Sequence, residues 1–269
     1  MLHLHSTVAI LATLLAAAAA IPVDGATPTT NTAVSLVAST APASTCTNLT
    51  PAEVTALQQK LALAPSTPDR QAILFPDPPS GCNYAYQFIN QTVTPPTGGS
   101  IVLAGVDQVP GLLGTSIGFA VGFVNACGLN VPHSHPRANE FLTVVEGQLI
   151  GGLILETAEG SDPSAPGPLP MITNTLQNFT GMLFPQGDVH FQFNPTCERA
   201  VFAAGFDNID PGRTQIARTF LSVMPDEALI TATGGVLDPA LINQLRDKIP
   251  NAFAELIDTC AKSCGIIPA

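Results

Sequence analysis

The chain has 269 residues and a formal net charge of −11, and only 11% of its side chains are charged. This length accommodates one sizeable domain with extensions, or two small domains. Because the acidic balance is not broken by any basic cluster, we expect neither nucleic acid nor an anionic membrane surface as a partner.

Residues 1–20 predict a signal peptide. Their apolar core has about a dozen residues, which is the length of a signal h-region and short of the ~20 needed to cross a bilayer. The small residues of Ala16–Ala26 offer cleavage sites, and a retained membrane anchor is the alternative. Residues 21–45 are rich in Ala, Thr, Ser and Pro with almost no charge, which is typical of a disordered or O-glycosylated linker. We therefore predict a secreted, extracellular protein.

Six cysteines agree with export, since an even count in an exported chain indicates disulfides. Glycosylation sequons begin at Asn90 and Asn178, and a weaker one at Asn48 is followed by Pro51. Sequons are common by chance, so they only permit a glycan.

Residues 46–100 predict an N-terminal extension. Thr50, Pro51 and Glu53 together predict the start of one short helix. The stretch 65–82 is rich in turn residues and is expected to be irregular.

Short strands are predicted across residues 101–223. Between 117 and 123 large and very small residues alternate with a period of two, and further strand-like runs cover 141–150, 151–155 and 200–206. The segment 159–170 has the composition of a surface loop. Many short strands with Gly/Pro turns and no intervening helices indicate an all-β antiparallel sandwich or barrel.

Residues 224–269 predict a C-terminal helical segment. One helix is expected from Pro225 to Gly234, a second from Asp238, and a third after Pro250. Their apolar faces must bury either against the strands of the same subunit or against a neighbouring subunit.

Three histidines follow the leader region, and all fall in two short motifs. His133 and His135 are separated by one residue, so on a strand both project from the same face. Glu140 follows after room for a short turn, and His190 lies in a second Pro/Gly-rich stretch, 185–194. These residues could be core or surface histidines, but the ligand spacing favours a site for a divalent metal ion.

The two motifs resemble those of the cupins, and within them the germin-like and spherulin-like secreted proteins. The resemblance covers about residues 46–251. The first motif is matched by His133, His135, Glu140 and Gly147, and the second by Pro185, Gly187, His190 and Asn194. The resemblance implies a single cupin jelly-roll β-barrel, and paired C-terminal helices that in germins interlock subunits into trimers or hexamers.

The chain departs from the family pattern at two glycines. Cys127 stands where the glycine opening the first motif is expected, and Phe179 where the second motif opens. Both departures lie in turns away from the ligands, so they concern local backbone geometry.

Disulfide pairing is predicted from the two neighbouring strands that the family fold implies. Cys127 and Cys197 lie at about the same level across the histidine-bearing pair, so we expect them to be bonded across the barrel mouth. A Cys46–Cys82 bridge would match the N-terminal bridge of germins. Cys260 and Cys264 would then be left to pair locally.

Three imidazoles and one carboxylate leave about two octahedral positions open, which suits Mn(II) or Fe(II). The resemblance implies manganese, with iron or another divalent ion as the alternative. The first functional hypothesis is an extracellular oxidoreductase acting on a small molecule, either a superoxide dismutase or an oxalate oxidase. Oxalate-oxidising germins position their substrate with two asparagines; Asn130 matches one of these and is the candidate substrate-positioning residue, whereas the other position falls at Ala120.

Two other classes remain open. One is a non-enzymatic cell-wall, spore-coat or storage protein stabilised by metal and disulfides. The other is a sugar- or small-ligand-binding protein, which would hold its ligand through purification. Turnover by the metal-loaded protein would distinguish an enzyme from both.

Overall fold

The computed structural model describes residues 47–76, 83–88, 98–156, 171–249 and 254–268, all within the unit Ser44–Ala269. The predicted signal peptide, the linker and the loop at 159–170 lie outside the described residues. So do Cys46 and Cys82, whose predicted bridge stays a prediction. None of the helices within the described ranges is long and apolar enough to cross a membrane.

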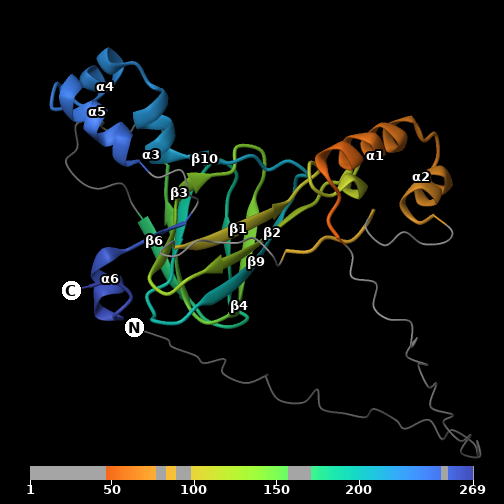
Figure 1. Cartoon of the computed structure of the whole chain (residues 1–269), viewed down its shortest axis with the longest axis horizontal. Helices are drawn as coiled ribbons and strands as arrows, with labels where there is room; N and C mark the ends of the chain where they lie inside the picture. The colour runs from red at the N-terminus through yellow and green to blue at the C-terminus, as the bar shows by residue number, and fades with distance from the viewer. Residues whose placement is uncertain (1–46, 77–82, 89–97, 157–170, 250–253, 269) are drawn as a thin grey trace, which may run out of the picture. The chain divides into compact units, whose positions relative to one another are not determined.

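Two antiparallel sheets form the body of the molecule (Figure 1). The first sheet has the strand order β1 (Gly99–Ala104), β2 (Gly118–Val124), β9 (Ala200–Phe206), β4 (Glu140–Glu146) and β7 (Gly181–Phe184). The second has the order β10 (Thr214–Gln215), β3 (Gly128–Ser134), β8 (Val189–Phe193), β5 (Leu149–Ile154) and β6 (Met171–Leu176), and β11 (Ala254–Leu256) also pairs with β3. This mostly-β jelly-roll confirms the predicted fold class and the predicted strands at 117–123, 141–155 and 200–206.

The hydrophobic core lies between the two sheets, where Leu142, Phe184 and Phe202 are almost fully buried. The small residues of β2 face this core. A Cβ atom on Gly122 would lie only 2.0 Å from the Phe202 ring, so the aromatic ring occupies the space that any larger residue would need. The period-two pattern of β2 therefore marks an inner face of small residues beneath a layer of large ones.

Two helices precede the sheets. In α1 (Pro51–Leu63) the side chains of Thr50 and Glu53 form the capping box that the sequence predicts. A second helix, α2 (Thr67–Leu74), occupies the first part of the stretch 65–82, which was expected to be irregular; residues 77–82 lie outside the described part of the chain. The side chain of Ser66 caps the first turn of α2. The sequence thus contained a helix-start signal, but the surrounding prolines favoured the prediction of turns.

The remaining helical elements are short: η1 (Pro110–Leu112), α3 (Ile216–Arg218), η2 (Thr219–Val223), α4 (Asp226–Ala232), α5 (Pro239–Lys248) and α6 (Asp258–Ser263). The predicted helices at 225 and 238 are confirmed, and the Asp238 side chain caps α5. Arg246 joins this group by donating to the Leu221 carbonyl and the Asp226 carboxylate. The third predicted helix is wrong in its first half, because residues 254–256 form β11 on the edge of β3.

The predicted disulfides Cys127–Cys197 and Cys260–Cys264 are also wrong: the structure pairs Cys127 with Cys260 and Cys197 with Cys264. There are two physical reasons. A bulge in β3 shifts the register, so the Cys127 amide donates to the carbonyl of Thr196. In addition, β11 carries α6 alongside the loop after β8, so that Cys260 and Cys264, one helical turn apart, each reach a different partner.

Candidate metal centre

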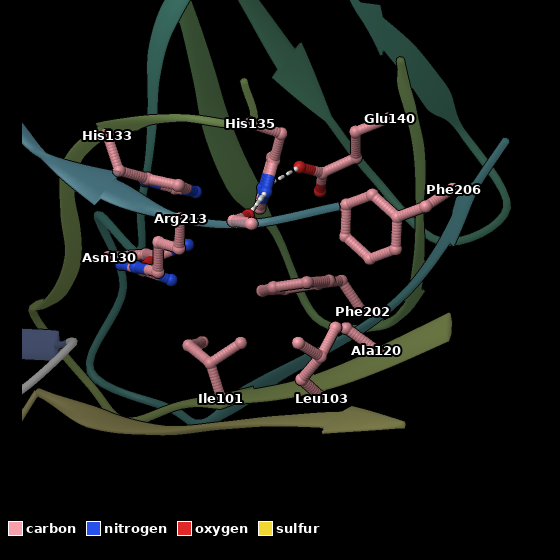
Figure 2. A pocket seen from close by; sticks show the side chains of 11 residues that line it. Ile101, Leu103, Ala120, Asn130, His133, His135, Glu140, Phe202, Phe206 and Arg213 are labelled. Atoms are coloured by element: carbon pink, nitrogen blue, oxygen red, sulfur yellow. Dashed lines mark hydrogen bonds and ion pairs between the residues drawn. The ribbon is translucent and has the colours of Figure 1, made fainter. Parts of the chain in front are cut away.

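The two sheets bring together the four predicted ligand residues. His133 on β3 pairs with His190 on β8, and His135 follows directly after the end of β3. Glu140 opens β4 in the opposite sheet and points back toward the histidines (Figure 2). One ligand atom from each residue lies within 4.8 Å of the others, and all four side chains are buried. This cluster could hold a single metal ion.

A bulge in β3 sets the position of the first two histidines. Asn130 pairs with Gln192 and His133 with His190, so between these two pairs β3 contains one more residue than β8. Pro132 lies inside the bulge, where its missing amide hydrogen costs no ladder bond. The bulge re-aims β3 immediately before the histidines.

Backbone carbonyls fix the orientation of all three imidazoles. Each Nδ1 faces one carbonyl oxygen: Val131 for His133 (2.8 Å), Gly212 for His135 (2.6 Å) and Asp188 for His190 (2.9 Å). Because a carbonyl can only accept, each Nδ1 carries the hydrogen and each Nε2 keeps its lone pair. Neutral imidazoles held in this way are the form that binds a metal ion.

Glu140 completes the donor set. Its Oε2 lies 3.0 Å from the Nε2 of His135 and 3.1 Å from that of His190. With hydrogen on Nδ1, these atoms are all acceptors, so their close approach requires a cation between them, either a proton or a metal ion. Burial alone would raise the pKa of Glu140, but the contacts with His135 and His190 outweigh it and lower that pKa. Burial, aided by the charge of Arg213, lowers the pKa of His133 well below its ordinary value.

A cavity of about 100 Å³ opens beside the cluster (Figure 2). The wall opposite the histidines is apolar and includes Ile101, Leu103 and Phe202. Ala120 lines the cavity as the strand spacing predicts, and it offers no hydrogen-bond donor there. A ligand that reaches the metal ligands must therefore contact both a polar side and an apolar wall.

Asn130 also lines the cavity and is almost fully buried. Its Oδ1 accepts a hydrogen bond of 2.8 Å from Nη2 of Arg213. Its Nδ2 donates to Oε1 of Gln192 at 2.5 Å. The candidate substrate-positioning residue is thus itself held between two polar side chains.

Sequence reasoning missed both of these partners. Gln192 could have been predicted from the sequence, because it lies two residues after His190 on a strand and so projects from the same face. Arg213 had no local signal. It reaches the cavity only because β10 pairs with β3, with Thr214 opposite Ser134, and such a long-range pairing cannot be read from spacing.

The second motif also has a structural task. Asn194 is fully buried, and its amide donates to the carbonyls of Val124, Asn125 and Glu198, closing the loop beyond β8. Gly187 adopts a φ of +88°, and its amide donates to the carbonyl of His135. These contacts tie the loop before His190 to the first motif.

The sheets and the cluster define the class of protein: a jelly-roll with three histidines and one carboxylate converging between its sheets. The chain belongs to the cupin family, whose model, described as "Cupin", matches residues 88–234.

Curated relatives are spherulins and germin-like proteins. Spherulin-1B of Physarum polycephalum is 31% identical over 236 residues, covering 87% of each chain, and Spherulin-1A is 31% identical over 211 residues, covering 78% of this chain and 79% of the relative. Germin-like protein 9-1 of Oryza sativa subsp. japonica is 31% identical over 178 residues, covering 64% and 68%. Among solved structures, oxalate oxidase in complex with the substrate analogue glycolate aligns with a TM-score of 0.52 at 22% identity, covering 61% of this chain and 79% of that one, which shows the shared fold.

Proposed function

We propose that this chain is an exported, metal-binding, germin-like cupin that carries out redox chemistry on a small anionic molecule, either superoxide or a small carboxylate such as oxalate. The observation that carries this proposal is the orientation of the imidazoles, which keeps three Nε2 lone pairs aimed at one point beside Glu140. His133, His135, Glu140 and His190 are the proposed ligands.

Manganese is the proposed ion, with iron or another divalent ion as the alternative. Three nitrogens and one oxygen fit an octahedral ion of borderline to hard character. Such an ion would supply a redox-active centre with about two open coordination positions. The role of the protein side chains is to hold neutral imidazoles in place and to bring a small anion into the adjoining cavity.

Two features bear on the choice between superoxide and oxalate. The solved relatives of the same fold include oxalate oxidase and, at TM-score 0.50, oxalate decarboxylase. Ala120, however, supplies no donor where the oxalate-oxidising pattern expects an asparagine. Dismutation makes fewer demands on the cavity, so both activities belong in the first assay.

A structural role is the second candidate. The relatives include two spherulins, and the two disulfides tie the C-terminal segment to the sheets. In a cell-wall, spore-coat or storage protein the ion would stabilise the fold without turnover. A fully metal-loaded protein that neither dismutates superoxide nor oxidises oxalate would favour this role.

The experiment that tests the proposed site is elemental analysis of the secreted protein and of its variants His190→Ala and Glu140→Ala. We expect about one metal ion per chain in the wild type and loss of most of this metal in both variants, because each variant lacks one of the four ligands. His190→Ala can also be compared with Gln192→Ala, a change on the same face of β8 that leaves the four ligands in place. Full metal content in His190→Ala would rule out the proposed ligand set.

Export is supported by the disulfides, which form and persist in oxidising compartments. Asn178 is exposed in the turn before β7 and is the proposed glycan site among the described residues. Asn48, by contrast, already pairs its side-chain amide with the backbone of Gln87. An extracellular location, on a cell wall or spore coat, follows as part of the same proposal.

A homo-oligomer is also proposed. Phe119, Phe141 and Leu183 lie in one row across the outer face of the first sheet, joined through Gly205 in the strand register. We call these three residues the outer apolar row; each side chain is 42% to 56% exposed. Contiguous exposed apolar residues of this kind mark interaction surfaces, and a second copy of the chain is the proposed partner.

A further inference from the structure

We infer that Arg213 is a specificity-determining residue that anchors the carboxylate of a short-chain monocarboxylic acid beside the metal centre. The inference rests on the proposed metal site and narrows its substrate class. In the two-asparagine pattern, the second substrate-positioning donor would stand at the position of Ala120, which has no donor. We assign the role of that donor to Arg213, which lies elsewhere in the chain.

The first step is the position of the guanidinium. Arg213 lines the same cavity as His133 and His135 and lies on the side where Asn130 is found (Figure 2). Its Nη2 donates to Oδ1 of Asn130, and Asn130 is in turn held by Gln192 on β8. This chain of hydrogen bonds fixes one edge of a planar group that is well suited to bind a carboxylate.

The second step is charge. Desolvation lowers the pKa of Arg213 to about 10, which still leaves the side chain protonated at neutral pH. Arg213 and Glu140 are the only charged side chains among the residues that line the cavity within the described part of the chain. With a divalent ion in place the cavity carries a net positive charge, although the protein as a whole is strongly acidic. An anion is therefore the ligand that this cavity selects.

The third step is the opposite wall. Ile101, Leu103, Ala120 and Phe202 present only apolar atoms from their side chains to the cavity. A second carboxylate placed against them would lose its hydration without gaining a hydrogen bond, which is costly. A methyl or ethyl group placed there would gain hydrophobic contact instead.

The last step is size. A cavity of about 100 Å³ is well below the roughly 300–1,000 Å³ of pockets that take drug-sized ligands, so it suits a small acid. Acids of about two to four carbons satisfy this limit, the charge and the apolar wall together. The carboxylate would face Arg213 and the ion, and the tail would face Leu103 and Phe202.

The test is isothermal titration calorimetry on the secreted full chain after its manganese content has been measured. Propionate is the probe, and acetate, oxalate and the neutral isostere propionamide are the comparisons. We expect propionate to bind about fourfold more tightly than acetate, from one additional buried methylene. Propionamide should bind at least about tenfold more weakly than propionate, because it lacks the charge that Arg213 recognises.

The variant arm compares Arg213→Gln with Arg199→Gln. Both changes remove one positive charge, but Arg199 is exposed on the surface and reaches Glu146 only at 3.9 Å. We expect Arg213→Gln to weaken propionate binding at least about tenfold with unchanged manganese content, and Arg199→Gln to leave both unchanged. Arg213→Lys should recover part of the affinity, since it restores the charge without the planar fork.

The outcomes separate the two proposals. Equal propionate affinity in Arg213→Gln and the wild type, both fully loaded, would overturn the role of Arg213 and leave the metal site standing. Propionamide binding as tightly as propionate would overturn it without any variant, as would tighter binding of oxalate than of propionate. A wild-type protein that takes up no manganese, iron or other divalent ion would overturn the metal site itself.

Discussion

Cys127 and Phe179 both adopt the left-handed backbone conformation, with φ angles of 59° and 63°, although neither is a glycine. These are the two positions where the family motifs were expected to open with glycine. A side chain in this conformation costs about 1–2 kcal/mol. Cys127 is retained by its bridge to Cys260, whereas the side chain of Phe179 is 83% exposed and has no comparable anchor.

Phe179→Gly should therefore raise the free energy of unfolding by about 0.5–1 kcal/mol, the relief of strain exceeding the added flexibility of glycine. A higher denaturant midpoint at unchanged slope would show this. Ile172→Gly is the control, because Ile172 is also exposed but lies within strand β6, outside the outer apolar row, where glycine destabilises. A lower midpoint for Phe179→Gly would contradict the interpretation.

His133 makes the metal-free protein sensitive to acid. Burial lowers its pKa below the unfolded value of about 6.5, so in mild acid the unfolded state binds a proton that the folded state excludes. Its contribution to stability is complete above pH 6.5 and is lost as the pH falls toward the folded pKa, by at most about 1.4 kcal/mol per pH unit. Urea unfolding of the metal-depleted protein at pH 7.5, 6.5 and 5.5 measures this, and His133→Gln should flatten the dependence. Equal free energies of unfolding at all three pH values would exclude this role of His133.

At the scale of elements, most of the features that could not be predicted from the sequence depend on the strands that pair with the edge of β3. Spacing alone was enough to group His133, His135 and Glu140, because the first motif runs from the end of β3 through a single turn to the start of β4. Arg213 and the two bridges depend instead on β10 and β11 reaching the same edge from 80 and more residues away. Leu256 and Cys260 also fit the apolar stripe of a helix, so the sequence pattern predicts a helix where residues 254–256 form strand β11.

Disulfide mapping checks this arrangement directly. Proteolysis without reduction should release peptides joined through Cys127–Cys260 and Cys197–Cys264. Replacing both Cys127 and Cys260 with serine should lower the free energy of unfolding by about 2–5 kcal/mol, because the bridge closes a long loop. A peptide joined through Cys127–Cys197 would contradict the structure and restore the pairing expected from the strands alone.

For the whole molecule, the outer apolar row predicts self-association. Phe141→Lys should lower the mass measured by light scattering, since a lysine at the centre of an apolar interface is costly to bury. Leu63→Lys provides the control: Leu63 is 84% exposed at the end of α1, away from the row. A monomeric wild type, or an unchanged mass for Phe141→Lys, would contradict this interface and return attention to α4 and α5.

The pairing of β3 with β11 also sets the order of events during synthesis. Cys127 leaves the ribosome 133 residues before its partner Cys260, which is about 7 to 27 s at roughly 5–20 residues per second. Cys197 emerges within that interval, at a time when the edge of β3 is still uncovered. In an oxidising compartment Cys127 can therefore meet Cys197 before its final partner, and a Cys127–Cys197 bond formed at that stage would have to be exchanged for Cys127–Cys260. Along that route a disulfide isomerase would speed maturation, because exchange without a catalyst takes minutes to hours.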